Sequence, residues 1–388
     1  MSAVPPAAAA AAAATVQPAP SSRVADGETI KPAVCDRPPM QSLPALLAAN
    51  QDNIGFADGA RTQTLRAALH DAAQIASRLA LTPGDVVMVR HTCSLEGVAC
   101  ALAAMVAGCT LLPLPTHAFP AGVPLDHAMT VHRPTVVLGT AAALHEAEYS
   151  IVRLRVRASA VYEANGPPCP HGAVDLSAQR AVTPSEDAAA PAEGAPALVC
   201  CPLVFSHSNV VALAWALKDT TADWLVDLDA PSLLARIVPR LCFGSGVVQL
   251  RKSAAVSAVR RPGIAPPPMR KSGPVAALPE RRQLSLASVF LEAAGFRMLG
   301  QGGAVTCTLR GDDDRFMQAA APNAKGALWV TGPGVPRRLD GDAGQAASRF
   351  AHDDAGRLWL AVGENAAVGA NGARLFVQRR PVRLHARL

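Results

Sequence analysis

The first third of the chain carries apolar residues at helical spacing. Five of them follow one another at intervals of four, three, four and three residues: Leu65, Leu69, Ala72, Ala76 and Leu79. Such intervals place side chains on one face of an α-helix. We therefore predict an amphipathic helix that begins near Thr62 and ends before the turn Pro83-Gly84-Asp85.

Short apolar runs alternate with a second helical pattern after that turn. The expected elements are a strand at Val86–Val89, a helix at Leu95–Ala107 capped by Gly108, strands at Thr110–Leu114 and Thr135–Leu138, and an alanine-rich helix from Thr140. Strand, helix and strand with short connections form a right-handed crossover in a parallel sheet. This part of the chain therefore predicts a layered α/β fold.

Two proline-rich stretches interrupt the regular patterns. Asn165–Pro196 is rich in proline, alanine and acids, which indicates a surface excursion. Ser253–Arg282 combines proline with arginine and lysine, and such a composition cannot bury enough apolar surface to fold alone. Between the two stretches we expect a strand at Ala197–Cys201 and a helix at Asn209–Leu217.

The C-terminal part shows short strand patterns. Apolar runs at Ala327–Val330, Leu358–Val362 and Leu375–Val377 are separated by glycine, aspartate and asparagine turns. This pattern is typical of a small β-rich unit.

These patterns divide the chain into parts of different character. Residues 1–40 form an alanine- and proline-rich arm without the basic start of a secretory signal, and we expect it to be disordered. Residues 41–250 predict an α/β domain, 251–285 a basic proline-rich linker, and 286–388 a small β-rich remainder of that domain.

Composition narrows the function classes. Hydrophobic residues make up 50% of the 388 positions but aromatic residues only 4%, so the core must consist of small aliphatic side chains. No apolar run is long enough to cross a membrane, so no membrane span is expected. The net charge of +6 is basic, but aromatic stacking positions and a reader motif are missing, which argues against a nucleic-acid partner.

The nine cysteines contain no C-x-x-C pair. Several lie inside apolar runs, where cysteine behaves as a small hydrophobe, so the pattern favours a reducing compartment and predicts no metal site. A cytoplasmic protein is the simplest expectation. The alternative is a peroxisomal or related organelle, because the last residues, Ala386-Arg387-Leu388, are similar to a peroxisomal targeting signal.

Four stretches, in sequence order, carry a family resemblance. The first stretch is residues 65–114, in which 81–87, LTPGDVV, and 104–114, AMVAGCTLLPL, resemble "G-x-x-P-G-D-R-V" and "A-x-x-x-A-G-A-x-x-V-P-L". Residues 204–210, VFSHSNV, are similar to "V-x-x-S-H-x-N-L". Residues 224–250 are similar to "W-L-P-x-x-H-D-M-G-L" and the strand that follows it.

The fourth stretch is residues 325–335, KGALWVTGPGV, which is close to "G-E-L-W-V-R-G-P-G-V"; residues 354–360, DAGRLWL, follow it like "D-E-D-G-R-L-W-F". These motifs belong to the adenylate-forming (AMP-binding) superfamily of acyl-CoA synthetases and fatty acyl-AMP ligases. The resemblance implies a layered α/β domain with a small β-rich second subdomain, ATP and Mg²⁺ as cofactors, and a carboxylic or acyl substrate from lipid metabolism.

The chemistry of that family needs a phosphate-binding loop. A carboxylate attacks the α-phosphate of ATP, and the charge on the phosphate oxygens is stabilised by backbone N–H groups, a cation and Mg²⁺. The family places a Ser/Thr/Gly-rich loop with a lysine directly before its "S-H-x-N" motif. Here the strand at Ala197–Cys201 runs into Val204–His207 through Pro202-Leu203, with no glycine, no lysine and no run of hydroxyls.

Other family positions are changed or missing as well. The family's His-Asp pair after "W-L-P" falls on Asp229-Ala230, so its histidine is replaced by Asp229. The metal-holding glutamate of "Y-G-x-T-E" becomes Cys307. The hinge "G-R-x-x-D" reads Gly363-Glu364-Asn365-Ala366-Ala367, and the chain ends at Leu388, so we expect the C-terminal lid domain and its lysine to be absent.

The remnants that could still contact ATP or AMP are Thr306, in the echo of "Y-G-x-T-E", and Asp342, the candidate ribose-binding aspartate. An ungapped count back from Gly356 puts Ser348 in that place instead. No residue is predicted to be catalytic, and none to bind a metal.

Several polar residues have simpler explanations than catalysis. We expect His207 to pack against the following helix and Ser206 to cap it. Acidic residues at 312–314 and 353–354 fit solvated turns, and a turn is also the simpler explanation for the glycines at 300–303. Cys200-Cys201 fits buried strand cysteines better than a redox pair.

The sequence therefore predicts a degenerate, truncated relative of the AMP-dependent ligases without full acid-activating activity, which binds an acyl or carboxylic-acid ligand or a protein partner. Two alternatives stay open. One is an active acyl-AMP or acyl-CoA ligase with a divergent site, and the other is a non-enzymatic scaffold that uses the basic linker and the N-terminal arm.

Overall fold

The computed structural model describes residues 41–114, 125–163, 168–177, 194–200, 203–219, 224–225, 228–250, 285–294, 303–310, 316, 323–339, 348–368 and 375–378. The predicted N-terminal arm, nearly all of the basic linker, Asp342, the acidic run 312–314 and the C-terminal tripeptide lie outside these residues. None of the described helices is both long and apolar enough to cross a membrane.

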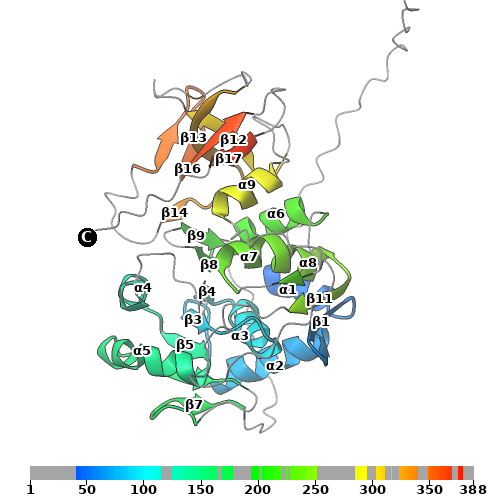
Figure 1. The fold of residues 1–388 in the computed structure, drawn as a ribbon, viewed down its shortest axis with the longest axis vertical. Helices are drawn as coiled ribbons and strands as arrows, with labels where there is room; N and C mark the ends of the chain where they lie inside the picture. The colour runs from blue at the N-terminus through cyan, green and yellow to red at the C-terminus, as the bar shows by residue number, and fades with distance from the viewer. Residues whose placement is uncertain are drawn as a thin grey trace, which may run out of the picture. The chain divides into compact units, whose positions relative to one another are not determined.

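The largest sheet has eight strands in the order β14-β9-β8-β4-β3-β5-β6-β7 (Figure 1). In that order they are β14 (Arg338–Leu339), β9 (Leu203–Ser206), β8 (Pro196–Cys200), β4 (Thr110–Pro113), β3 (Val86–Arg90), β5 (Val136–Gly139), β6 (Ala158–Val161) and β7 (Val174–Asp175). Strands β8, β4, β3, β5, β6 and β7 run parallel, while β9 and β14 are antiparallel to their neighbours. The predicted parallel layer is confirmed.

Helices cover both faces of this sheet. They are α2 (Leu65–Arg78), α3 (Leu95–Val106), α4 (Leu125–His132) and α5 (Ala141–Arg153). In β3, Val87 and Val89 join the core cluster that contains α2 and α3, while Met88 joins the cluster that contains α4 and α5. Because successive side chains of a strand point to opposite faces, this split places the two helix pairs on opposite sides.

Local sequence signals set where several helices begin. A serine or threonine hydroxyl accepts a hydrogen bond from the backbone N–H three residues further on at the start of α2, α3 and α5. The same cap begins α1 (Leu43–Ala49) and α9 (Leu286–Ala293). Such caps satisfy N–H groups that have no partner inside the helix.

The buried face of α2 differs from the prediction. Leu65, Ala72 and Leu79 are buried as expected, but Leu69 is only half-buried, and the unpredicted Ile75 is 2% exposed. The residues before Leu65 form a strand instead of the predicted first helical turn, because β2 (Arg61–Thr64) pairs with β1 (Ile54–Asp58). Thr62 therefore pairs with Ala57 in the sheet and is not part of the helix.

A second sheet has the order β10-β11-β1-β2. It joins β10 (Trp224–Leu225) and β11 (Gly246–Leu250) to the hairpin β1–β2 near the start of the described chain. Asn50 ties the same segments together: its Nδ2 donates to the carbonyls of Leu241, at 2.9 Å, and Gly244, at 3.0 Å. The Asn50 side chain thus satisfies carbonyl groups at the C-terminal end of α8 (Val238–Phe243).

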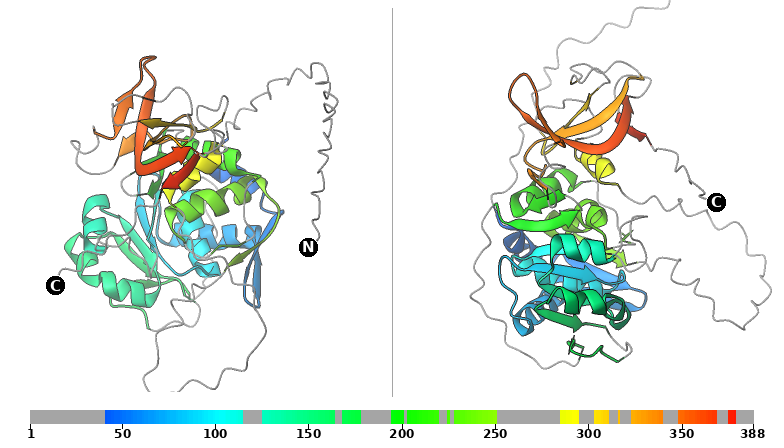
Figure 2. Two further views of the ribbon diagram at one scale, coloured as in Figure 1. Left: turned by 45° about the horizontal axis from the view of Figure 1, so that its top comes forward. Right: turned by 90° about the vertical axis from the view of Figure 1, so that its left-hand side faces the viewer.

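The predicted β-rich unit is confirmed as a five-stranded antiparallel sheet, drawn in orange and red in Figure 2. Its strands are β12 (Thr306–Arg310), β13 (Lys325–Thr331), β15 (Phe350–His352), β16 (Leu358–Val368) and β17 (Leu375–Gln378). The acidic turn before β16 also behaves as expected, because Asp353 Oδ1 accepts from the N–H groups of Ala355, at 3.0 Å, and Arg357, at 2.8 Å. The division of the chain at residues 251–285 stays a prediction.

Asp85 connects three segments beside β3. Its carboxylate accepts hydrogen bonds from Thr82 N, at 2.9 Å, and Thr135 Oγ1, at 2.8 Å, and pairs with Arg157 at 2.8 Å. Burial alone would raise the pKa of Asp85, but the Thr82 and Thr135 hydrogen bonds and the Arg157 charge outweigh it, so the pKa lies below its ordinary value.

Asp85→Asn should lower the free energy of unfolding by about 2 kcal/mol at pH 7, since the amide has one acceptor oxygen and its NH2 group cannot accept a hydrogen bond. A depressed folded pKa stabilises above the unfolded pKa and loses that contribution as pH falls through the folded value. Denaturant unfolding should therefore give a difference between wild type and variant that is complete at pH 7 and shrinks below about pH 4. Asp52→Asn, in an exposed pair with Arg66, is the control and should leave the transition unchanged.

Candidate functional site

A β-hairpin lies where the motif resemblance led us to expect a phosphate-binding loop. Strands β8 and β9 are antiparallel, with Cys200 paired to Leu203 and Val199 to Val204. Only residues 201 and 202 lie between the last paired residues. The strand β9 was not predicted, and its presence means that the chain goes directly from one paired strand into the next.

A capping box closes the N-terminus of the helix that follows the hairpin. In α6 (His207–Leu217), Ser206 Oγ accepts from Asn209 N at 3.2 Å, and Asn209 Oδ1 accepts from Ser206 N at 3.1 Å. Ser208 Oγ lies 2.9 Å from Ser206 Oγ. The predicted capping role of Ser206 is confirmed, and the N–H groups of Ser206 and Asn209 donate to the chain's own side chains, while that of His207 donates to the Ala195 carbonyl.

His207 is packed inside the molecule, as predicted. The residue is 3% exposed, and neither ring nitrogen has a partner in hydrogen-bond geometry among the described residues. Burial lowers the pKa of His207, while the Gly108 carbonyl opposes part of that shift. The imidazole is therefore neutral above about pH 6.5 while it stays buried.

Asn209 also reaches the β-rich part of the chain. Its Nδ2 donates to the carbonyls of Pro333, at 2.7 Å, and Val335, at 3.2 Å. These residues form the turn between β13 and β14, where the sequence GPGV resembles a family motif. Sequence reasoning connected neither motif to the other, because 124 positions separate Asn209 from Pro333.

The two predicted nucleotide remnants are not brought together by the described structure. Thr306 is the first residue of β12, half-buried, and paired with Thr331 of β13. Asp342 lies outside the described residues. The nucleotide-binding role of both residues stays a prediction.

Cys307 is the residue that the motif resemblance matches to the family's metal-holding glutamate, a correspondence that stays a prediction. The residue is fully buried in β12, and burial raises the pKa of its thiol to about 12. A neutral buried thiol is a poor ligand for Mg²⁺, which prefers oxygen donors. No cluster of His, Cys, Asp and Glu suitable for a metal was found among the described residues.

Residues that the motif resemblance matches to two other family positions take structural roles. Asp229, at the place of the family's histidine, caps the short helix α7 (Ala230–Ser232), and its Oδ1 accepts from Ser232 N at 2.7 Å. Gly363 and Glu364, at the place of the hinge, lie inside the long strand β16. The predicted absence of the lid domain stays a prediction.

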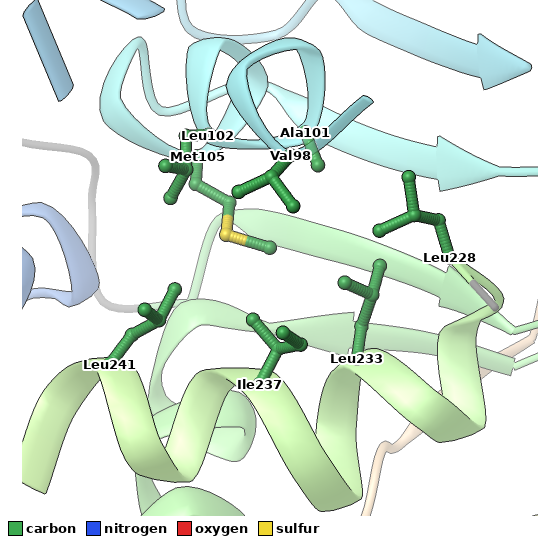
Figure 3. A pocket seen from close by; sticks show the side chains of 8 residues that line it. All are labelled: Val98, Ala101, Leu102, Met105, Leu228, Leu233, Ile237 and Leu241. Atoms are coloured by element: carbon green, nitrogen blue, oxygen red, sulfur yellow. The ribbon is translucent and has the colours of Figure 1, made fainter. Parts of the chain in front are cut away.

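A small apolar cavity lies between α3 and the helical segment made of η1 (Leu233–Ile237), a π-helical turn, and α8 (Figure 3). Val98, Ala101, Leu102 and Met105 face it from one side, and Leu228, Leu233, Ile237 and Leu241 from the other. Its volume is about 10 Å³, close to the smallest space that holds one water. An acyl chain does not fit here without rearrangement of these side chains.

The comparison with solved structures identifies the fold. This chain is similar to a long-chain-fatty-acid-CoA ligase from Archaeoglobus fulgidus, with a TM-score of 0.63 and 13% identity over 89% of this chain and 85% of that one. It is also similar to MatB from Rhodopseudomonas palustris, with a TM-score of 0.60 and 14% identity over 87% and 78%.

The N-terminal domain of FACL13 from Mycobacterium tuberculosis gives a TM-score of 0.58 at 13% identity over 88% of this chain and all of that domain. No protein-family description matches the sequence, and no curated protein sequence matches it either. The chain therefore has the layered α/β fold of the N-terminal domain of adenylate-forming enzymes, at an identity that shows the fold alone.

Proposed function

We propose that this protein keeps the fold of the ATP-dependent acid ligases but does not form acyl adenylates, and that it works by binding a carboxylic or acyl ligand or a protein partner. The observation that carries the proposal is the β8–β9 hairpin, in which two residues join the paired positions Cys200 and Leu203. A connection of that length cannot wrap around a triphosphate.

The surroundings of the hairpin support the same conclusion. A polyphosphate is bound by backbone N–H groups at a loop or a helix N-terminus, together with cations. Here the N–H groups of β9 belong to the sheet, and the capping box occupies the N-terminus of α6. The buried thiol of Cys307 supplies no charge for Mg²⁺ at the position of the family glutamate.

ATP–pyrophosphate exchange tests the loss of activation. We expect no exchange above the enzyme-free blank with ATP, Mg²⁺ and a panel of short- to long-chain carboxylic acids, because the charge on the α-phosphate would have no stabilising donors. Titration calorimetry with ATP and Mg²⁺ should likewise show no saturable heat.

Acid-dependent exchange would overturn this proposal in favour of a divergent ligase. In that case Thr306→Ala and Asp342→Ala should each abolish the exchange, since these are the remaining nucleotide-contact candidates. Ser348→Ala is measured beside them, because an ungapped count places Ser348 at the ribose-binding position instead; loss of exchange in Ser348→Ala but not in Asp342→Ala would assign that position to Ser348.

Two further measurements distinguish binding of a carboxylic or acyl ligand from binding of a protein partner. A carboxylic or acyl ligand should raise the midpoint of thermal unfolding in proportion to its affinity for the folded chain. A protein partner that uses the basic linker should be lost from pull-downs when residues 251–285 are deleted, while thermal shifts with fatty acids stay unchanged.

A further inference from the structure

His207 occupies an unfavourable site for a titratable side chain. Its ring is almost completely buried, and neither ring nitrogen has a partner in good hydrogen-bond geometry among the described residues, although the Gly108 carbonyl acts on the ring. It is the first residue of α6, where the helix dipole places partial positive charge. A protonated imidazole there would lack both a hydrogen-bond acceptor of good geometry and a compensating anion.

The structure describes titratable groups on several elements around this helix. Among the described helices and strands, α1, η1, α8, α9, β8 and β9 pack most closely against α6. Their titratable residues are Arg236 in η1, Arg240 and Cys242 in α8, Glu292 in α9 and Cys200 in β8. Burial and the Gly108 carbonyl are the causes of the shifted pKa of His207, and next to Gly108 the buried thiol of Cys109 stays neutral, with its pKa raised to about 12.

The first turn of α6 is also the point where the helix holds the β13–β14 turn. The side-chain oxygen of Asn209 accepts a hydrogen bond in the capping box, and its side-chain nitrogen donates to the carbonyls of Pro333 and Val335. The turn is held further by Gly334 N, which donates to the Ala304 carbonyl at 2.8 Å. Any movement of the first turn of α6 therefore acts on the start of β12 and on the β13–β14 turn.

We propose that His207 and Asn209 form an acid-sensitive latch, in which protonation of His207 forces its ring out of the buried site, opens the first turn of α6 and releases the turn at residues 332–335. The latch is a property of the fold and holds whether or not the chain activates acids. Its two parts are adjacent in one helical turn, so one side chain senses pH and the other makes the connection.

The pH window follows from the direction of the pKa shift. The ordinary histidine pKa is 6.5, and burial lowers it in the folded state. Above about pH 6.5 the ring is neutral in both the closed and the open state, so the latch is unaffected. Below that value only the open state binds the proton, and the closed state loses up to about tenfold in population per pH unit.

Amide hydrogen exchange at pH 7.5 and 5.5 tests the latch, with rates corrected for the chemical effect of pH. In the wild type, protection of Gly334 and Val335 should fall by up to about tenfold at pH 5.5. His207→Leu should give equal protection at both pH values, and Asn209→Ala should be weakly protected at both. The exposed His127→Leu is the matched control and should behave as the wild type.

Three results of the exchange experiment would overturn the latch. They are equal protection of the wild type at both pH values, the same loss of protection in His207→Leu as in the wild type, and full protection of Asn209→Ala. If circular dichroism shows that His207→Leu does not fold, His207→Gln replaces it, because glutamine does not titrate. A ring titration of His207 by NMR with a midpoint at or above 6.5 would also overturn the latch.

Discussion

Trp359→Ala should lower the free energy of unfolding of the β-rich sheet by about 4 kcal/mol, because it removes the largest fully buried side chain described in this protein. Trp359 is 1% exposed in β16. Its ring stacks on Phe316 with a centroid distance of 5.4 Å, and its Nε1 donates to Asp353 Oδ2 at 3.0 Å. Alanine would leave a cavity and would remove one of the two hydrogen bonds that Asp353 Oδ2 accepts, the other coming from Arg357 Nε at 2.8 Å.

The local aromatic cluster makes this effect larger than elsewhere in the core. Phe316 also meets Trp329 edge-on at 5.4 Å, and the Arg310 guanidinium lies 5.0 Å from the Trp329 ring centroid. The sequence is only 4% aromatic, so few such contacts exist to replace these. Aromatic pairs contribute on the order of 1 kcal/mol beyond the area they bury.

Denaturant unfolding followed by circular dichroism measures the effect. Trp359→Phe is the matched control: it keeps a ring for the stack but loses the Asp353 hydrogen bond and part of the buried volume, so about 2 kcal/mol is expected. A loss below about 1 kcal/mol for Trp359→Ala would show that the aromatic cluster does not hold this sheet.

The parts of the fold that depend on neighbouring residues could be predicted from the sequence. The strands around Met88 and Val137 and the helix at Leu95–Val106 follow from local periodicity, and the Ser206 cap follows from a motif of four residues. Caps and amphipathic faces involve residues within one or two helical turns. Periodicity therefore carried most of the information about the parallel layer.

The elements that could not be predicted depend on distant partners. Strand β1 pairs with β11 through Ile54 and Gly246, and nothing in the local pattern of either segment indicates the other. The short strand β7 lies in a stretch that was interpreted as a surface excursion, because two residues carry no periodicity. Strand β9 was not predicted, because it has only four residues and no loop signal separates it from the strand before it.

The candidate site also contains features that depend on neighbouring residues and features that depend on distant ones. The absence of a glycine- and lysine-rich loop could be inferred because its place in the sequence is fixed by the flanking strand and helix. The connection from Asn209 to the β13–β14 turn could not, since it depends on how the two parts of the chain meet. A family motif thus identified the fold, while the role of its asparagine required the structure.

Gly97 is expected to give the second large effect, because there is no room for a side chain at this position of α3. A Cβ atom at Gly97 would lie 2.4 Å from the Thr92 carbonyl oxygen and 2.6 Å from Leu228 Cδ1. The first of these neighbours is backbone and cannot move aside. Gly97→Val should therefore destabilise the protein by about 3 kcal/mol, and the gain in helix propensity over glycine, below about 1 kcal/mol, does not offset the clash.

Thermal and denaturant unfolding of Gly97→Val, compared with Gly194→Ala, provide the measurement. No atom lies within 4 Å of a Cβ placed at Gly194, so this substitution should change stability by less than about 0.5 kcal/mol. Adding Leu228→Ala to Gly97→Val should not restore stability, because the clash with the Thr92 carbonyl is still there. Full rescue by the second substitution would show instead that the side-chain contact alone excludes larger residues from this turn of α3.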